Sequence, residues 1–243
     1  MPFNLLPRSV FWYFSFAVTL IWHTPGLFWA RRKSKSMEPR EFDKYIHKIA
    51  SRWALGNAQR SGAKFHIEGF ENIPKDQAVV FVANHQGDFD IAVFLAYFPI
   101  PHGYVAKIEM LKVPLLRDWM KNMRCIFIDR SSIRQTAGAM LEGIKVLQNG
   151  HSLVLFPEGT RSKSTTMGEF KSASFKLAAK AKVPIVPVTI DGTYKIMEEN
   201  RRFIKPADVY VKIHPAIATD GNADIAGLSE KVRGIIEDGL NKV

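Results

Sequence analysis

The chain has 243 residues, of which 47% are hydrophobic, so it can bury a sizeable core and is expected to form one α/β domain with a short appendage. A formal net charge of +11 favours anionic partners such as lipid headgroups, nucleic acid or phosphorylated substrates. The single cysteine, Cys125, excludes an intrachain disulfide, and with so few sulfur ligands a zinc site is not expected. Cys125 lies in an apolar run, which predicts a buried thiol without a chemical role.

An apolar segment rich in aromatic residues occupies residues 8–30. Its longest uninterrupted run, residues 10–22, is shorter than the roughly 20 residues that a membrane-spanning helix needs, and Pro25 would end or kink a helix. Aromatic side chains favour the headgroup boundary, and four cations follow, as anionic lipid would favour. These cations are Arg31, Arg32, Lys33 and Lys35. We expect an anchor that dips into one leaflet, with a single membrane span as the alternative.

Residues 37–60 have the pattern of an amphipathic helix, and Pro39 suits its first turn. Apolar residues recur at helical spacing at Phe42, Tyr45, Ile46, Ile49 and Trp53, and cations recur on a neighbouring face at Arg40, Lys44, Lys48 and Arg52. Such a helix can lie in a membrane surface or dock on the globular body. The chain is therefore predicted to divide into a membrane-associated helix pair, residues 1–60, and an α/β domain, residues 61–243.

From residue 64 onward, short apolar runs alternate with helical segments, a pattern typical of a largely parallel sheet. The predicted strands are residues 65–67, 78–83, 104–107, 125–128, 152–156, 185–190 and 209–213. Ser132 with Gln135 resembles a capping box that opens a helix to about Gln148, and a last helix begins at about Leu228. The predicted fold class is α/β, with a mixed, largely parallel sheet flanked by helices.

Residues with chemical potential gather in N-H-Q-G-D-F-D, residues 84–90, directly after a predicted buried strand. In open α/β sheets, ligands collect at the carboxyl ends of strands. A histidine has an ordinary pKa of about 6.5 and can take and return a proton near neutrality. If a helix begins after the turn, the carboxylate of Asp90 can fold back onto the imidazole of His85 and fix its tautomer, as base catalysis requires. Alternatively, Asp88 or Asp90 caps the helix.

Two further polar segments follow strands. Residues 127–130 end in Asp129 and Arg130, which can pair with each other, or Arg130 can meet an anion. Residues 156–162 read F-P-E-G-T-R-S, with a glycine that allows a tight turn or close approach to a ligand. Its backbone N–H groups, with Thr160 and Arg161, could hold a phosphate monoester, and Glu158 could accept a hydrogen bond from a substrate hydroxyl. The alternative is a polar turn with a local Glu–Arg pair. Residues 183–188, V-P-I-V-P-V, form a rigid apolar strand that could wall an acyl chain.

Together and in this order, the motifs resemble the glycerolipid acyltransferase family, specifically the 1-acylglycerol-3-phosphate acyltransferases. The N-H-x-x-x-x-D block is met at Asn84, His85 and Asp90, and the F-I-D-R, F-P-E-G-T-R-S and V-P-I-V-P-V blocks are met at residues 127–130, 156–162 and 183–188. The resemblance covers about residues 64–220. Each motif alone is weak, but four in register are a specific signal.

The resemblance implies a glycerol-phosphate acyltransferase-like αβ domain with an N-terminal two-helix membrane-docking element, as in bacterial members. Residues 105–109 resemble a family segment whose lysine, here Lys107, lies near the substrate phosphate. Many relatives carry serine where this chain has Gly87, so no hydroxyl is available at that position.

The implied reaction transfers a fatty acyl group from an acyl thioester to the sn-2 hydroxyl of lysophosphatidate, giving phosphatidate. Acyl carrier protein and coenzyme A are equally suitable carriers of the thioester. The resemblance makes His85 and Asp90 the catalytic residues and implies a substrate-binding set of Lys107, Arg130, Glu158, Gly159, Thr160 and Arg161. It implies no covalent acyl-enzyme, no cofactor and no metal. An anionic membrane is the expected partner, at the cytoplasmic face of a bacterial inner membrane.

Competing functions remain open on the sequence alone. The chain could instead acylate glycerol 3-phosphate at sn-1 or another lysophospholipid, or it could be a non-catalytic membrane-binding protein. Binding to nucleic acid is disfavoured because the Lys and Arg residues are spread out and no nucleic-acid-binding motif is present.

Overall fold

The structure, a computed structural model, describes residues 5–241 apart from the side chain of Arg31. It contains all seven predicted strands, with ends shifted by at most two residues. They are β1 (Lys64–Glu68), β2 (Val80–Ala83), β3 (His102–Lys107), β4 (Ile126–Ile128), β5 (Ser152–Leu155), β6 (Ile185–Asp191) and β7 (Asp208–Ile213). The apolar runs alone were therefore sufficient to locate the sheet.

The strands form one sheet in the order β1-β7-β6-β2-β5-β3-β4. All neighbouring pairs are parallel except β6 and β7, which confirms the predicted mixed, largely parallel sheet. Because β6, β2, β5, β3 and β4 run in one direction, their carboxyl ends meet at the same edge. Each polar motif of the sequence follows one of these ends, so the topology brings the motifs together.

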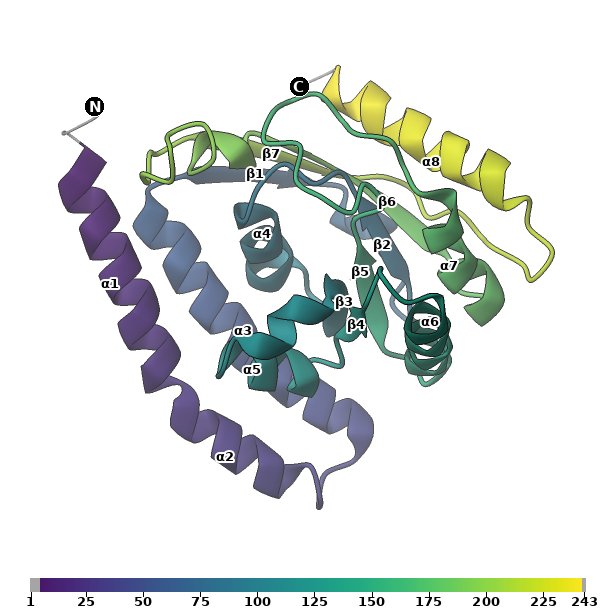
Figure 1. Cartoon of the computed structure of the whole chain (residues 1–243), viewed down its shortest axis with the longest axis horizontal. Helices are drawn as coiled ribbons and strands as arrows, with labels where there is room; N and C mark the ends of the chain where they lie inside the picture. The colour runs from purple at the N-terminus through teal and green to yellow at the C-terminus, as the bar shows by residue number, and fades with distance from the viewer. Residues whose placement is uncertain (1–4, 242–243) are drawn as a thin grey trace.

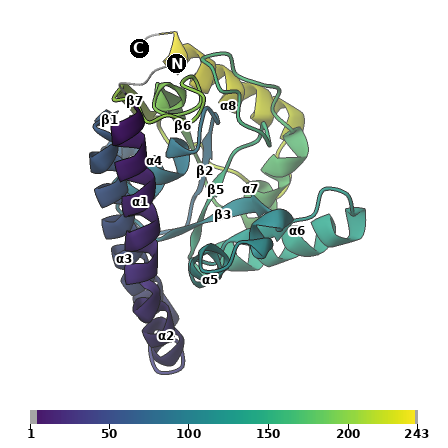
Figure 2. The ribbon, with the colours of Figure 1, turned by 60° about the vertical axis from the view of Figure 1, so that its left-hand side comes forward.

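Helices cover both faces of the sheet (Figures 1 and 2). The α-helices of the body are α3 (Pro39–Ser61), α4 (Phe89–Tyr97), α5 (Leu116–Asn122), α6 (Ile133–Gln148), α7 (Lys176–Ala181) and α8 (Ile225–Leu240). Short 3-10 helices are η2 (Phe70–Asn72), η3 (Ile108–Lys112), η4 (Ser172–Phe175) and η5 (Thr193–Lys195). Alternate strand residues face opposite layers: Phe81 packs in the cluster with α3 and α4, and Val82 in the cluster with α6, α7 and α8.

The N-terminal apolar segment forms two helices, α1 (Leu6–Trp22) and α2 (Thr24–Lys33), with His23 between them. Among residues 5–241, no helix is both long and apolar enough to cross a membrane. Trp12 attaches α1 to the body, because its Nε1–H donates to the carbonyl oxygen of Asn57 at 2.9 Å and its ring lies 5.4 Å from that of Phe89. The segment therefore packs against the helix that follows the His85 turn.

Helix α3 docks on the globular body, which is one of the two arrangements that its pattern allowed, and contact of its exposed face with a membrane stays a prediction. Its apolar side chains, among them Phe42, Ile46 and Ala50, are buried in the same cluster as Trp12 and Phe94. Its cations Arg40, Lys44, Lys48 and Arg52 are exposed. The predicted segments 1–60 and 61–243 thus share one core, and their division stays a prediction; residues 1–4 and 242–243 lie outside the described residues.

Local capping signals fix two helix starts. Ser132 accepts a hydrogen bond from the backbone N–H of Gln135 at 3.3 Å, and α6 begins and ends where the capping box predicted. Helix α8 begins at Ile225, three residues before the predicted start, because Asp224 accepts from the N–H of Ala226 at 3.1 Å and serves as its N-cap.

The thiol of Cys125 is buried in the core, as predicted, and burial raises its pKa to about 12. It therefore stays protonated and unreactive at neutral pH.

A partly buried ion pair links α3 to the segments that precede β4 and β5. Asp43 of α3 accepts a hydrogen bond from Nε of Arg124 at 2.7 Å and contacts Nδ1 of His151 at 3.1 Å. Burial raises the pKa of the Asp43 carboxyl, but the hydrogen bonds and charges of His151 and Arg124 outweigh burial and leave the pKa below its usual value.

We expect Asp43→Asn to lower the free energy of unfolding by about 1–3 kcal/mol at pH 7, because Arg124 and His151 lose a buried anionic partner. The pKa of Asp43 is lower in the folded chain than the unfolded value of about 4, so its contribution is present above that value and is lost as the pH falls through the folded pKa. Urea unfolding of both proteins from pH 7 downward should show the difference shrinking below about pH 4. Asp238→Asn, at an exposed position on α8, is the control. A difference that stays constant with pH would contradict this account.

Candidate active site

The segments after the parallel strand ends surround one cavity of about 580 Å³. The residue after β2 is Asn84, β3 ends at Lys107, and β5 is followed by the segment that contains Gly159, Thr160 and Arg161. Side chains from each of these segments line the cavity. The topology therefore gathers at one place residues that are far apart in the sequence.

The carboxylate of Asp90 folds back onto His85, as the spacing predicted. Its Oδ2 lies 2.7 Å from Nδ1 of His85 and also accepts the backbone N–H groups of Gln86 and Gly87, at 2.7 and 2.9 Å. Its Oδ1 accepts the hydroxyl of Thr193 at 2.5 Å. Because the carboxylate only accepts, the imidazole carries its hydrogen on Nδ1, and Nε2 is left with a lone pair.

The capping alternative is only partly correct. Asp88 occupies the N-cap position of α4, but its side chain makes no capping hydrogen bond. Asp90 in the first turn binds the amides of the preceding turn rather than those of the helix. The side chains of Asp88 and Asp90 therefore contact residues outside α4 and do not cap it.

Contacts to the ring and to the backbone hold His85 in place. It stacks on Phe156 with centroids 4.1 Å apart and planes 20° apart. The carbonyl oxygen of His85 accepts the N–H of Ser162 at 2.8 Å, and the N–H of His85 donates to Glu158 at 2.7 Å. The side chain is 17% exposed, so one edge of the imidazole reaches the cavity while the rest is enclosed.

Glu158 braces the loops around His85 and is not among the residues that line the cavity. Its Oε1 accepts the N–H of His85 and its Oε2 accepts the N–H of Gly168 at 2.8 Å. Burial raises the pKa of this carboxyl, although these hydrogen bonds oppose the shift. The predicted contact with a substrate hydroxyl stays a prediction, and the contacts present here are structural.

Arg161 lines the cavity together with His85. Its Nη1 contacts a carboxylate oxygen of Asp88 and lies 3.3 Å from Oε1 of Glu198, so its partners differ from the local pair with Glu158 that the motif allowed. Burial raises the pKa of Glu198, and the nearby Asp88 charge adds to this, while Arg161 lowers it. The Arg161 side chain is 30% exposed and therefore reachable by an anion.

The other predicted cations also reach the cavity. Lys107 and Arg130 line it, as do Gly159 and Thr160. Nη1 of Arg130 donates to the carbonyl oxygen of Gly159 at 2.6 Å. The possible pairing of Arg130 with Asp129 is not formed, because Asp129 accepts from the N–H and hydroxyl of Ser131 at 2.9 and 2.6 Å.

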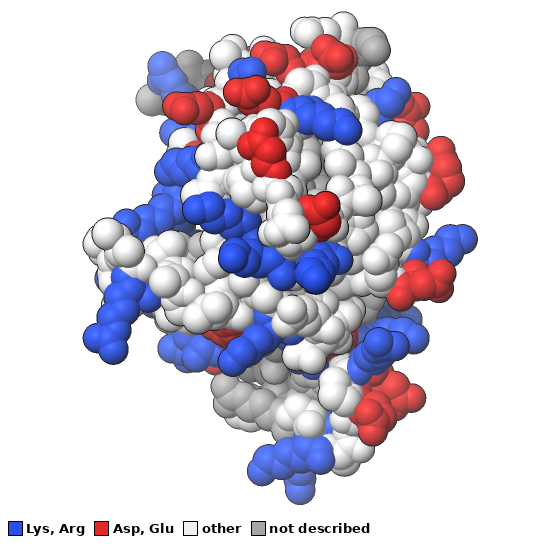
Figure 3. Space-filling view, turned by 90° about the vertical axis from the view of Figure 1, so that its right-hand side faces the viewer, with Lys and Arg blue, Asp and Glu red and all other residues white. Residues whose placement is uncertain are grey.

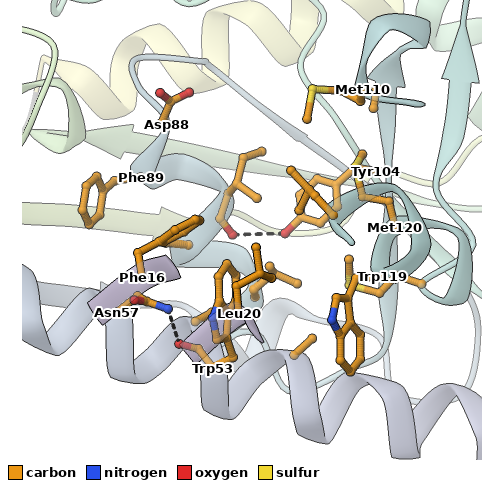
Figure 4. Close-up of a pocket in the computed structure, with 18 of the residues that line it drawn as sticks. Phe16, Leu20, Trp53, Asn57, Asp88, Phe89, Tyr104, Met110, Trp119 and Met120 are labelled. Atoms are coloured by element: carbon orange, nitrogen blue, oxygen red, sulfur yellow. Dashed lines mark hydrogen bonds between the residues drawn. The ribbon is translucent and has the colours of Figure 1, made fainter. Parts of the chain in front are cut away.

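The rest of the cavity is apolar and is built by helices. Trp12, Phe16 and Leu20 of α1 face Trp53 of α3 and Trp119 of α5, and Figure 4 shows Asp88 on the opposite side of the cavity from Trp53 and Trp119. The expectation that residues 183–188 wall an acyl chain is wrong. Most of this segment lies in β6, between β2 and β7, and its side chains are enclosed by the two helix layers.

The sequence did not show the roles of several contributors. Asn84 exchanges two hydrogen bonds of 2.8 Å with the backbone of Ile190, and Gln86 accepts the N–H of Gly192 at 2.9 Å. These bonds join the ends of β2 and β6 and place Thr193 on Asp90. Thr193 could have been found, because it follows a predicted strand and a glycine, whereas Glu198 carries no such signal.

Chemically, the arrangement offers a histidine base, a set of cations and an apolar cavity. Within residues 5–241, His, Cys, Asp and Glu side chains form no group of three that could hold a metal ion.

Comparison with known proteins agrees with this arrangement. The acyltransferase family model matches residues 64–191. A 1-acyl-sn-glycerol-3-phosphate acyltransferase of Borreliella burgdorferi is 35% identical over 75% of this chain and 72% of that protein. A probable 1-acyl-sn-glycerol-3-phosphate acyltransferase of Mycoplasma genitalium is 35% identical over 80% of this chain and 76% of that protein.

A solved structure is also similar. The crystal structure of the 1-acyl-sn-glycerophosphate (LPA) acyltransferase PlsC from Thermotoga maritima matches with a TM-score of 0.86 and 28% identity, over 98% of this chain and 95% of that one. The match includes the N-terminal helices as well as the sheet. The chain therefore belongs to the acyltransferase family, as its four motifs predicted, and its relatives there are 1-acyl-sn-glycerol-3-phosphate acyltransferases.

Proposed function

We propose that this protein transfers a fatty acyl group from an acyl thioester to the sn-2 hydroxyl of 1-acylglycerol 3-phosphate, making phosphatidate for phospholipid synthesis. One observation carries the proposal: His85, whose Nδ1 is bonded to Asp90, and Arg161 line the same largely apolar cavity. Such a cavity suits an acceptor with a phosphate at one end and an acyl chain at the other. The names of the relatives support the same reaction.

In this reaction, Nε2 of His85 accepts the proton of the sn-2 hydroxyl while the hydroxyl oxygen attacks the thioester carbonyl carbon. The new C–O bond gives a tetrahedral intermediate, and the C–S bond then breaks. The imidazolium returns its proton to the departing thiolate, so the products are an ester and a free thiol. Asp90 holds the tautomer and stabilises the imidazolium through the 2.7 Å bond to Nδ1.

The phosphate of the acceptor binds to Arg161, assisted by Lys107, and this contact sets the distance from hydroxyl to base. Arg130 contributes charge beside Gly159 and Thr160, which border the same part of the cavity. In this scheme Glu158 acts by bracing His85 through its backbone.

The acyl donor is a thioester of acyl carrier protein or of coenzyme A, and both carriers are anionic. Figure 3 shows Lys and Arg side chains spread over the middle and lower part of the face that carries α6, α7 and α8, with acidic side chains between them. A net charge of +11 favours approach of either donor. No cofactor beyond this co-substrate is proposed.

The N-terminal helices are proposed to dock on an anionic membrane, at the cytoplasmic face of a bacterial inner membrane. Large apolar side chains of α1 and α2 are exposed: Val10, Phe11, Phe14, Ile21, Trp22, Phe28 and Trp29 are each at least half exposed. Water-exposed aromatic residues on this scale favour a lipid interface. Since α1 also lines the cavity, a lipid acceptor can enter from the membrane.

We expect purified protein, given lysophosphatidate with acyl-coenzyme A or acyl carrier protein thioester, to release thiol and form phosphatidate, with glycerol 3-phosphate a much poorer acceptor. His85→Ala should lower the rate at least about 100-fold, because general-base catalysis is lost, while the fold and liposome binding stay intact.

The matched control is His66→Ala. His66 and Asp208 also form a His–Asp contact, of 2.9 Å, but it is exposed and does not line the cavity. Full activity of the His85 variant would remove His85 from the reaction, and preference for glycerol 3-phosphate would favour sn-1 acylation.

Arg161→Lys should raise the KM for lysophosphatidate by about tenfold, because the lysine ammonium cannot reproduce the planar fork of the guanidinium. The KM for the thioester donor should change much less. Initial rates with one substrate varied at a time provide the measurement. Equal effects on both KM values would argue against a phosphate clamp.

Phe14→Glu should weaken binding to anionic liposomes by about tenfold, because a side chain that is 67% exposed on α1 would no longer enter lipid. Leu141→Glu on α6, where the side chain is 62% exposed, should have no effect. Co-sedimentation with phosphatidylglycerol-containing liposomes compares the two. Equal loss in both variants would point to a general charge effect and against docking through α1.

A further inference from the structure

Asp88 is an N-cap residue whose carboxylate does not cap its helix. It precedes Phe89, the first residue of α4, yet its side chain accepts no capping hydrogen bond. The carboxylate instead contacts Nη1 of Arg161 across the cavity wall, where Figure 4 shows it at the upper side. With 46% of its side chain exposed, Asp88 has room to leave this position.

The second carboxylate on Arg161 is held in place. Glu198 is only 5% exposed, and its Oε1 accepts the backbone N–H of Asp88 at 2.8 Å as well as contacting Nη1 at 3.3 Å. The turn also packs closely on it, since a Cβ at Gly87 would lie 2.6 Å from its Oε2. Glu198 is thus a fixed support for Arg161, whereas Asp88 is the partner that can be exchanged.

Within residues 5–241, four cations line the cavity, and Arg161 is the one paired with carboxylates. Lys107, Arg130 and Arg202 form no ion pair with any of the described residues. A phosphate that binds Arg161 through Nη1 must therefore replace Asp88.

We infer that Asp88 is an internal competitor for the acceptor's phosphate on Arg161, so that the need to displace it raises the KM for the acceptor. The inference rests on the proposed function, in which Arg161 binds the phosphate. A phosphate monoester carries about −1.5 to −2 charges at pH 7, and it can therefore replace the single charge of Asp88 on the guanidinium.

The position of Asp88 lowers the cost of release. The first N–H groups of a helix have no partner within the helix, and their partial positive charge favours an anion. Once displaced from Arg161, the carboxylate of Asp88 can accept from these groups as an ordinary N-cap does. The carboxylate therefore has two alternative positions, one on Arg161, which the acceptor takes over, and one at the first N–H groups of α4.

The test measures the KM values for lysophosphatidate and for the thioester donor in the full-length protein. Asp88→Asn should lower the KM for lysophosphatidate about threefold and leave the KM for the donor unchanged. Asp88→Ser, which removes the charge but keeps a capping oxygen, should behave alike. Asp76→Asn, an exposed carboxylate in the loop before β2, should leave both KM values unchanged.

A double variant separates the inference from the function on which it rests. The effect of Asp88→Asn on the KM for lysophosphatidate should vanish in an Arg161→Gln background, because the competition needs the guanidinium. An unchanged KM for lysophosphatidate in both Asp88 variants overturns the inference even if Arg161→Gln raises that KM. If Arg161→Gln itself leaves that KM unchanged, the phosphate clamp fails first.

Discussion

Four hydrogen bonds converge on the carboxylate of Asp90, and the geometry of the site depends on them. They come from the imidazole of His85, the amides of Gln86 and Gly87, and the hydroxyl of Thr193. A buried carboxylate is tolerated only when such partners replace water. Because the same group binds the turn, the base and the segment after β6, loss of Asp90 would disturb the tautomer and the position of the base together.

The parallel run of five strands explains why so compact a site arises from distant motifs. Carboxyl ends meet at one sheet edge, where backbone N–H and C=O groups no longer pair within the sheet and polar loops are favoured. Next to this edge, helices α1, α3 and α5 supply an apolar cavity. The fold therefore joins a polar edge to an apolar interior, which matches the two ends of a lysophospholipid.

The sequence was sufficient for whatever depends on local pattern. Apolar runs located every strand, Ser132 fixed the start of α6, and the spacing from His85 to Asp90 predicted their contact. Long-range packing could not be predicted from the sequence. Residues 183–188 do not line the cavity because β6 lies in the middle of the sheet, and α1 lines it instead. The contacts of Glu198 arise in a loop without regular structure. Neither leaves a periodic signature.

The contacts that the carboxylates of the site make support His85 as the base in the proposed reaction. Both oxygens of Glu158 accept backbone amides, and both oxygens of Asp90 are bonded within the site. Asp88 and Glu198 both contact Nη1 of Arg161. His85, by contrast, lines the cavity, and the 2.7 Å contact of its Nδ1 with Asp90 leaves the lone pair on Nε2. A hydroxyl bound beside Arg161 would therefore find its proton acceptor in the imidazole.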